Sequence, residues 1–367
     1  MKFSIDREAL LEPLQVVSSV VERKQTLPIL SNLLLAVEKD TLSLTGTDQE
    51  VELIARTKTF GCDKVGEITV PARKILDIFR SLPLAASVEC DVREGRLFIE
   101  SGTFKSQLAT LPVLDFPSVE MESSDVTFDL AAGALRQLLD KTSFALAQQD
   151  VRYFFNGLLL QVEGNLVRCV ATNGQRLATS YADEVEAGSS EQFIIPRKGV
   201  NELSRLVQGG GDLNVEMRFS SNHMQAHCAQ TTLTTKLIDA TYPDYTRAIP
   251  EGGDKVVVGN RLLVKEALSR TAILSNELYR NVRLVLEPGK LGMHANNPFL
   301  EEAEETVLVE YDGLPLDIGF NVGYLIETLT ILKGESVRME FTDANSACLL
   351  TDPDDINSCY VISPMML

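Results

Sequence analysis

The sequence predicts an α+β protein made of three tandem copies of one domain, each with two helices and about eight strands. The first observation is that Val70-Pro71, Ile195-Pro196 and Phe320-Asn321 occupy equivalent places, 125 residues apart. The second is that a short apolar strand passes directly into an amphipathic helix at each place. The third is the length of the repeat, because a unit of this size can bury its own core. The strand-to-helix runs span 68–82, 193–207 and 318–332.

The chain length agrees with this division. A chain of 367 residues corresponds to two or three domains at about 150 residues per domain. The first copy ends at the turn-forming run Asp115-Phe116-Pro117-Ser118, and the second at Tyr242-Pro243-Asp244-Tyr245. We therefore expect domains at 1–121, 126–249 and 250–367.

The second copy illustrates how the elements follow one another. Residues 131–147 carry apolar side chains at helical spacing, including Leu135 and Leu139, so they predict a helix. Two β-rich runs follow at 156–163 and 165–172. They are joined at Glu163-Gly164-Asn165, which is typical of a hairpin.

The remainder of this copy fits the same pattern. Strands are predicted at 176–182 and 193–195. A helix is predicted at 199–207, and the glycines at 209–211 terminate it. Three or four short strands are predicted between 213 and 239. Each copy is thus expected to hold its two helices among its strands.

The composition excludes several classes of protein. The amino terminus lacks an apolar stretch of signal-peptide length, and no run approaches the roughly 18 apolar residues that span a bilayer. We therefore expect a cytoplasmic protein. The six cysteines form no CxxC pair, so free thiols are expected rather than a metal-binding or disulfide framework.

Histidine offers one candidate metal site. His223 and His227 are four residues apart, a spacing that would place two ligands on one face of a helix. Their surroundings are rich in threonine and alternate as in a strand pair, and the glutamate of an HExxH motif is absent. We therefore expect strands here, and neither a metal nor a cofactor.

Several segments, taken together, resemble one protein family. They are TLPILSNLLL (26–35), LSLTGTDQEVEL (42–53), VPARK (70–74), QDVRY (149–153), ATNGQRLA (171–178), PRKGV (196–200) and YVISPMML (360–367). In this order and register they resemble the bacterial DNA polymerase III β subunits, the sliding clamps. The resemblance runs through the whole chain. It implies a closed ring of six similar domains, formed by two chains head to tail around duplex DNA, and no catalysis.

The charge distribution is an independent test, because a net charge of −18 argues at first against a nucleic-acid partner. The six predicted helices together carry +6, which leaves −24 on the rest of the chain. Helices that face a central hole would therefore give it a mildly basic lining that contacts phosphates without reading bases. Ordinary solvated helix faces are the alternative explanation. The helices are expected at 6–24, 72–82, 133–146, 196–207, 260–275 and 322–333.

The resemblance implies that a set of basic, amide and aromatic residues on or beside these helices contacts DNA. Phe154 stands where the family commonly has tyrosine, so stacking or packing would remain there while a hydrogen bond is lost. The set consists of Lys24, Arg73, Gln149, Tyr153, Phe154, Arg197 and Lys198.

The acidic run 301–305 has two interpretations. It could supply metal ligands, but a strand would turn its side chains to both faces. The resemblance instead implies that it meets basic residues of the first domain of a second chain, beside apolar contacts. Ser106 stands where the family usually has an aromatic residue. The interface set is Lys74, Arg96, Lys105, Ser106, Leu108, Ile273, Leu274, Glu301, Glu302 and Glu304.

The resemblance also implies a hydrophobic pocket for partner peptides between the second and third domains and the carboxyl-terminal tail. Two arginines at the edge of an apolar cleft suit peptides with hydrophobic residues and an acidic or polar group, and methionine adapts to varied shapes. Core packing is the alternative for Leu177 and Val361. The pocket set is Phe155, Thr172, Gly174, Gln175, Arg176, Leu177, Pro243, Arg247, Ala248, Val361, Ser363, Pro364 and Met365.

The implied partners are duplex DNA, the DNA polymerase III alpha subunit, the clamp loader, other polymerases and repair proteins, and a second copy of the chain. Two other classes of function remain open. One is an enzyme, such as a hydrolase that uses the 301–305 run, although nucleotide-binding and nucleophile motifs are missing. The other is a passive scaffold that binds only proteins.

Overall fold

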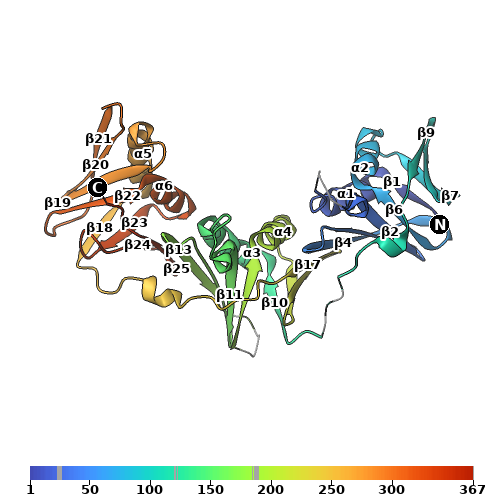
Figure 1. Ribbon diagram of the computed structural model, residues 1–367, viewed down its shortest axis with the longest axis horizontal. Helices are drawn as coiled ribbons and strands as arrows, with labels where there is room; N and C mark the ends of the chain where they lie inside the picture. Colours follow the sequence, from blue (N-terminus) through green and yellow to red (C-terminus); the bar gives the residue numbers. More distant parts are fainter. Residues whose placement is uncertain (23–26, 120, 122, 184, 186–189, 367) are drawn as a thin grey trace. The chain divides into compact units, whose positions relative to one another are not determined.

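The computed structural model describes residues 1–367 except 23–26, 120, 122, 184, 186–189 and 367 (Figure 1). The first copy opens with a strand and a helix, and a second strand-to-helix junction follows at Pro71. Its elements are β1 (Lys2–Asp6), α1 (Arg7–Val17), η1 (Pro28–Ser31), β2 (Asn32–Glu38), β3 (Thr41–Thr47), β4 (Val51–Lys58), β5 (Phe60–Lys64), β6 (Gly66–Pro71), α2 (Ala72–Ser81), β7 (Ser87–Arg93), β8 (Arg96–Ser101), β9 (Phe104–Ala109) and η2 (Val113–Asp115).

The second copy has the same order of helices and strands, except that four strands instead of five lie between its two helices. Its elements are β10 (Val126–Ala131), α3 (Ala132–Thr142), η3 (Ser143–Ala145), η4 (Tyr153–Asn156), β11 (Gly157–Glu163), β12 (Leu166–Thr172), β13 (Arg176–Ala182), β14 (Ser190–Pro196), α4 (Arg197–Val207), β15 (Asn214–Phe219), β16 (His223–Cys228) and β17 (Thr231–Lys236).

The third copy follows a short 3-10 turn, η5 (Tyr245–Ala248). Its elements are β18 (Lys255–Asn260), α5 (Arg261–Thr271), η6 (Ala272–Leu274), β19 (Asn281–Glu287), β20 (Lys290–Asn296), β21 (Glu302–Leu308), β22 (Leu316–Asn321), α6 (Val322–Ile331), β23 (Ser336–Phe341), β24 (Cys348–Asp352) and β25 (Asp355–Ile362). The predicted pattern of two helices among about eight strands is thus confirmed in each copy.

The equivalent positions found in the sequence have equivalent places in the structure. Pro71, Pro196 and Asn321 are each the last residue of a strand that passes into α2, α4 or α6. At Asn321 the side-chain oxygen accepts a hydrogen bond from Gly323 N at 2.9 Å, which caps α6. The prolines cannot cap in this way, but their fixed φ suits the residue that precedes a helix.

Helix α1 contains a proline, and a side chain from the neighbouring strand compensates for it. Pro13 has no N–H to bond to the carbonyl of Ala9, four residues earlier. The Thr57 hydroxyl on β4 donates to that carbonyl oxygen at 3.0 Å. The helix therefore continues to Val17 with Leu10, Leu14 and Val17 buried.

Three helices are shorter than the sequence predicts. The predictions 6–24, 131–147 and 260–275 become α1, α3 and α5, which end at Val17, Thr142 and Thr271. After α3 and α5 the chain tightens into the 3-10 turns η3 and η6. Such turns continue the apolar pattern of the helix, which is why the sequence does not reveal the helix end.

Of the four sheets that the described residues form, two are shared between successive copies. One eight-stranded sheet has the order β10-β15-β16-β17-β4-β3-β2-β6, and the other β14-β11-β12-β13-β25-β24-β23-β18. The joins are antiparallel, with Leu233 paired to Leu53 and Leu177 paired to Val361. The two smaller sheets, β5-β1-β7-β8-β9 and β21-β20-β19-β22, belong to the first and third copies.

This sharing determines how the chain divides into compact units. One unit holds Met1–Gly133 and Asn201–Leu237, and the other holds Ala134–Val200 and Ile238–Leu367. The second copy is divided between them because each half of its strands belongs to a neighbour's sheet. None of the helices formed by the described residues combines the length and the apolar character that crossing a bilayer requires.

Candidate DNA, peptide and subunit interfaces

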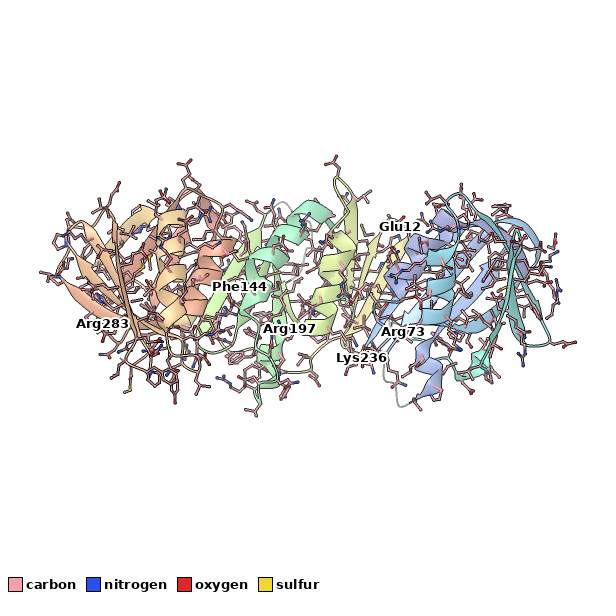
Figure 2. The ribbon with its side chains drawn as sticks, turned by 90° about the horizontal axis from the view of Figure 1, so that it is seen from above. Glu12, Arg73, Phe144, Arg197, Lys236 and Arg283 are labelled. Atoms are coloured by element: carbon pink, nitrogen blue, oxygen red, sulfur yellow. The ribbon has the colours of Figure 1, made fainter. Side chains whose placement is uncertain are left out.

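Helix α2 presents a basic face because its apolar residues lie on the other side. Ile75, Leu76 and Phe79 are buried, whereas Arg73 and Lys74 are exposed. Arg73 is labelled in Figure 2. Two cations side by side on a solvated face can approach phosphates without desolvation. The predicted DNA contact of Arg73 is therefore sterically open.

Helix α4 holds two further basic residues of the set. Arg197 is half-buried, and its guanidinium donates to the carbonyl oxygens of Leu146 and Ala147 at 3.3 Å each. Lys198, the next residue, is also half-buried. Lys24 lies outside the described residues.

The loop before η4 is held by one carboxylate. The Arg152 backbone N–H and its Nε donate to Asp150 Oδ1 at 2.8 and 3.0 Å. The hydrogen bonds from the Arg152 side chain and backbone lower the pKa of Asp150 to about 2. This bracing exposes Gln149, at φ +54°, together with Tyr153, as a DNA contact requires.

Phe154 packs within the protein, which is one of the two roles predicted for it. Its ring lies 4.6 Å from that of Phe155 and 6.4 Å from that of Tyr242, half-buried against an apolar cluster. Stacking of Phe154 on DNA stays a prediction, and packing within the protein is the contact observed.

This apolar cluster forms where β13 and β25 pair. It contains Phe155, Leu177, Tyr242 and Val361, which are all at most 8 % exposed. Ala347 and Leu349 pack against it from the third copy. Leu177 and Val361 are therefore packed as core residues, while half-buried apolar side chains surround them.

A tight turn lies beside the cluster at 172–176. Thr172 Oγ1 accepts from Gly174 N at 3.0 Å, and Asn173 Oδ1 accepts from Gln175 N and Arg176 N at 3.0 Å each. Gly174 has φ +85°, a conformation that favours glycine. A Cβ at this position would lie 2.8 Å from Arg152 Nη1, so glycine allows Arg152 to cross the turn.

The two arginines predicted at the edge of the pocket behave differently. The guanidinium of Arg176 is stacked on Phe144 and Tyr324, at 5.1 and 4.6 Å, and forms an ion pair with Glu327. The Arg176 side chain is only 9 % exposed, whereas that of Arg247 is 86 % exposed. Arg247 pairs with Asp244 at 3.1 Å, but of the two arginines it is the one whose guanidinium a partner group can reach.

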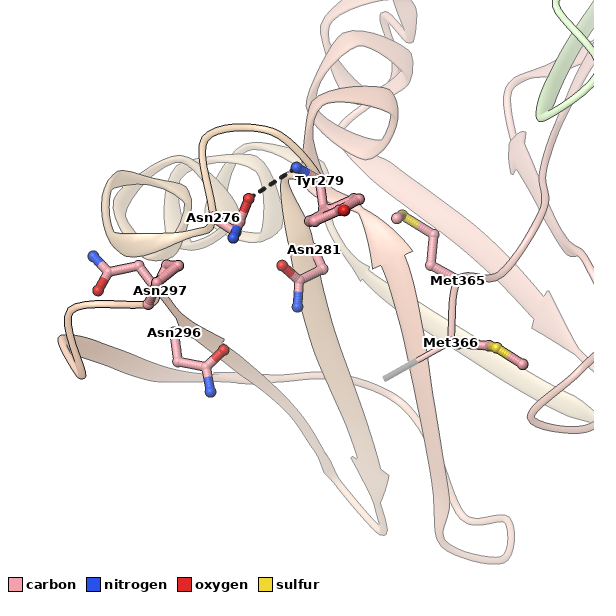
Figure 3. A pocket seen from close by; sticks show the side chains of 8 residues that line it. Asn276, Tyr279, Asn281, Asn296, Asn297, Met365 and Met366 are labelled. Atoms are coloured by element: carbon pink, nitrogen blue, oxygen red, sulfur yellow. Dashed lines mark hydrogen bonds between the residues drawn. The ribbon is translucent and has the colours of Figure 1, made fainter.

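The carboxyl-terminal tail is less exposed than its sequence suggests. Ser363 N donates to Gln175 O, and Met365 N donates to Gly319 O, both at 2.8 Å. Pro364 and Met365 are half-buried, whereas Met366 is 97 % exposed. Figure 3 shows the side chains of both methionines. Backbone hydrogen bonds thus hold the tail against β22 and cover part of its apolar surface. Pro243 and Ala248 are exposed at η5.

Sequence reasoning missed Arg152, Phe144, Tyr324 and Glu327 as neighbours of the predicted pocket. Arg152 lies over the Phe155 ring at 4.7 Å. The sequence could have indicated that Tyr324 and Glu327 lie on one face of α6, because residues three apart on a helix share a face. The partner of that face could not be read from the sequence.

The predicted subunit interface maps to two edge strands. In the first copy β9 ends the five-stranded sheet, and Lys105 on it is exposed, as is Arg96 on the adjacent β8, while Leu108 is buried. Ser106 is half-buried, and its hydroxyl has no recorded hydrogen bond among the described residues. Lys105 pairs with Glu100 at 2.9 Å.

In the third copy β21 ends the four-stranded sheet. Glu302 and Glu304 are exposed on one face, while Glu305 on the other face forms an ion pair with Arg270 on α5. The predicted splaying of the 301–305 run is therefore confirmed. Ile273 is 77 % exposed in η6, and Leu274 is half-buried.

Across the described part of the chain, no group of three or more His, Cys, Asp or Glu side chains could hold a metal ion. His223 and His227 lie on strand β16, as expected. Burial raises the pKa of the Cys90 and Cys169 thiols to about 12, which keeps them unreactive.

Comparisons with known proteins cover the chain from end to end. The sequence matches three family models: the N-terminal domain of the DNA polymerase III beta subunit over residues 1–120, the central domain over 129–244, and the C-terminal domain over 246–366. It is 50 % identical to a Beta sliding clamp of Pseudomonas aeruginosa and 44 % identical to that of Escherichia coli strain K12, over the full length of both chains in each case.

Solved structures agree with these sequence matches. A crystal structure of the DNA polymerase sliding clamp from Pseudomonas aeruginosa with ligand superposes with a TM-score of 0.98 at 50 % identity, and another, bound to griselimycin, with 0.97. Caulobacter crescentus pol III beta gives 0.95 at 36 % identity. All three comparisons cover both chains completely. The fold, the edge strands and these similarities together establish that the chain belongs to the bacterial DNA polymerase III beta subunit family, the beta sliding clamps.

Proposed function

We propose that two copies of this chain close head to tail into a ring around duplex DNA, with β9 of one copy facing β21 of the other. Membership of the family makes the chain a non-catalytic processivity factor of DNA polymerase. The proposal concerns which residues perform the three tasks of that role: closing the ring, holding DNA and binding partner proteins.

The observation that carries the ring is the complementarity of its two edges. Strands β9 and β21 each end a sheet, so each has a row of main-chain groups that can pair with another strand. Basic Arg96 and Lys105 belong to the first edge, and acidic Glu302 and Glu304 to the second. Because each edge complements the other edge rather than itself, the two favour a head-to-tail contact between copies. Such a contact forms a ring only if the rotation that relates the two copies closes on itself. The remaining interface set, namely Lys74, Ser106, Leu108, Ile273, Leu274 and Glu301, is proposed with them.

The DNA contact is proposed for Lys24, Arg73, Gln149, Tyr153, Phe154, Arg197 and Lys198. The exposure of Arg73 and of the 148–153 loop supports it. A basic helix face holds phosphates by charge and leaves the bases unread, as a protein that slides requires.

The peptide pocket is proposed around the cluster at β13 and β25, with the turn at 172–176 and the tail as its walls. Two observations support this pocket. Half-buried apolar side chains surround the buried cluster, and the Arg247 guanidinium is exposed beside it. The pocket set named from the sequence is retained. Arg152, Tyr324 and Glu327 are added as its borders.

Two further assignments accompany these. We place the domain boundaries at 1–121, 126–249 and 250–367, which the matched family ranges support. We place the protein in the cytoplasm, where bacterial DNA is replicated. The hydrolase alternative conflicts with family membership, and the passive scaffold is the alternative that an experiment must exclude.

The test uses the full-length chain with the clamp loader of the same organism. Protein loaded onto a nicked circular plasmid should stay bound during gel filtration, and cutting the plasmid with a restriction enzyme should release it. A scaffold that binds only proteins would stay off both forms of DNA. Equal retention on circular and linear DNA would also contradict an encircling ring.

A further inference from the structure

The repeat gives the proposed peptide pocket a counterpart where the first two copies share a sheet. At the first join β4 pairs with β17, and at the second join, which holds the pocket, β13 pairs with β25. The paired residues Leu177 and Val361 of the second join correspond to Glu52 and Thr234 of the first. Leu177 and Glu52 stand at the same distance after the threonine that ends β12 or β3.

The turns that precede these pairs have the same hydrogen bonds. Thr47 Oγ1 accepts from Gln49 N at 3.0 Å, and Asp48 Oδ1 accepts from the backbone N–H groups two and three residues later, at 2.9 and 2.8 Å. The turn at 172–176 has these three bonds in the same places. Gln49 adopts φ +78°, close to the +85° of Gly174. The two joins are therefore built on one plan.

Corresponding segments also form a buried apolar cluster in both copies. In the first copy it contains Ile29 and Leu30 from η1, together with Phe116 from the segment that connects to the second copy. In the second copy the corresponding residues are Phe155 from η4 and Tyr242 from the next connecting segment. Each cluster thus combines a 3-10 turn with the chain that leads into the next copy.

The two joins differ in the paired residues themselves. Leu177 and Val361 are part of an apolar cluster, whereas Glu52 and Thr234 are polar and equally buried, at 4 and 2 % exposure. Thr234 Oγ1 accepts from Gln225 Nε2 at 3.2 Å. Burial raises the pKa of the Glu52 carboxyl. Because a buried carboxyl costs stability unless its contacts offset the cost, the contacts of Glu52 determine its effect at this join.

Glu52 holds the first connecting segment. The backbone N–H of Val119 donates to Glu52 Oε2 at 3.2 Å, three residues after the buried Phe116. The segment is thus fixed by an apolar side chain and by a main-chain bond to a buried carboxyl. Leu177 has no acceptor that could hold the second connecting segment in this way, and that segment instead forms η5, where Arg247 is exposed.

We propose that the first join is a closed counterpart of the peptide pocket, and that Glu52 and Thr234 exclude partner peptides from it. The inference rests on the proposed peptide pocket and deepens it, because it gives hydrophobic peptide segments a single site in each chain. An apolar peptide side chain placed on Glu52 would remove water from the carboxyl and displace the Val119 N–H, which leaves both groups without a partner.

The test counts the peptides that one chain binds, by calorimetry on the full-length protein. The probe is the clamp-binding segment of the DNA polymerase III alpha subunit of the same organism. The native chain should bind one peptide. The double variant Glu52→Leu/Thr234→Val copies the pair of the second join and should bind two, the second at most about a hundredfold more weakly than the first. Glu67→Leu, at an exposed position on β6 of the same sheet, is the control and should bind one.

The affinity of the first site should stay unchanged in the double variant, which shows that the variant is folded. One peptide per chain in the folded double variant, or two in the native chain, overturns the inference. If the peptide does not bind the native chain at all, the peptide pocket is overturned as well.

A single substitution tests the role of Glu52 without any peptide, and it decides the matter if the double variant does not fold. Glu52→Ala should speed hydrogen exchange of the Val119 amide about tenfold, as the loss of one hydrogen bond gives. Glu52→Gln retains an oxygen acceptor and should exchange at the native rate, as should Glu67→Ala. An unchanged rate in Glu52→Ala shows that Glu52 does not hold the segment and overturns the inference.

Discussion

The guanidinium of Arg176 lies 4.6 Å from the centre of the Tyr324 ring, so the first residue of β13 is held by a helix of the following copy. Glu327, one helical turn after Tyr324, forms an ion pair with the same guanidinium. The Tyr324 hydroxyl also accepts from Asn173 Nδ2 at 3.1 Å. Helix α6 thereby fixes the turn that borders the proposed peptide pocket.

Removing the charge of Glu327 should weaken this join. Because Arg176 is largely buried, Glu327→Gln should lower the free energy of unfolding by about 1–2 kcal/mol, measured from the urea midpoint. Glu266→Gln is the matched control, because the pair of Glu266 with Arg270 is more than half exposed on both sides. It should change stability by less than about 0.5 kcal/mol. Equal effects of the two substitutions would show that Glu327 does not hold Arg176.

The turn at Gly174 should not tolerate a methyl group. Gly174→Ala strains a backbone at φ +85° and displaces Arg152, so it should cost about 1–2 kcal/mol of stability and weaken peptide binding. Gly164→Ala separates the two effects, because its φ is +60° and nothing lies within 4 Å of the added carbon. The control should be destabilised but should bind peptide normally. Peptide affinity that is unchanged in Gly174→Ala would place the pocket elsewhere.

The direct affinity for DNA should depend on charge and not on base sequence. Arg73→Ala and Lys198→Ala should each weaken DNA binding to a similar extent on any sequence and reduce the slope of log affinity against log salt by about 1. Lys290→Ala, an exposed cation on the β19–β20 hairpin, should leave the slope unchanged. Fluorescence anisotropy at several salt concentrations measures this. A loss confined to particular sequences would argue against phosphate contacts.

The exposed isoleucine of η6 should matter only in the dimer. Ile273→Ala with Leu274→Ala should cost on the order of 2–5 kcal/mol per residue at the subunit interface if both are buried there, and yield folded monomers in sedimentation. Ile356→Ala, which is 87 % exposed on β25, should remain dimeric. An undiminished dimer of the double variant at low concentration would remove η6 from the interface.

Lowering the pH should remove the stabilising contribution of Asp150 to its loop. The pKa of this carboxyl is lowered from 3.8 to about 2 in the folded chain, so its stabilising effect is complete above pH 4 and is lost as the pH falls towards 2. Asp150→Asn should therefore flatten the pH dependence of the unfolding midpoint between pH 4 and 2. A curve with the native slope in this window would show that the Arg152 contact contributes nothing.

The sequence was sufficient to predict the repeat and the strand-to-helix junctions, because these depend on local patterns such as Val70-Pro71 before an amphipathic run. It was not sufficient for the surroundings of Arg176, since its pair with Glu327 joins residues 151 positions apart. The same holds for Phe154, whose neighbour Tyr242 comes from a distant turn. Helix ends were also missed where a 3-10 turn continues the apolar pattern.

The sharing of sheets between copies has a consequence for dissecting the chain. A fragment cut to contain only the second copy would lose β4 beside β17 and β25 beside β13. Strands β17 and β13 would then present unpaired main-chain donors and acceptors next to apolar side chains such as Leu233 and Leu177. Exposed strand edges of this kind pair with other chains and aggregate. The central repeat therefore depends on both neighbours for its solubility, and a shortened chain should retain whole sheets rather than whole repeats.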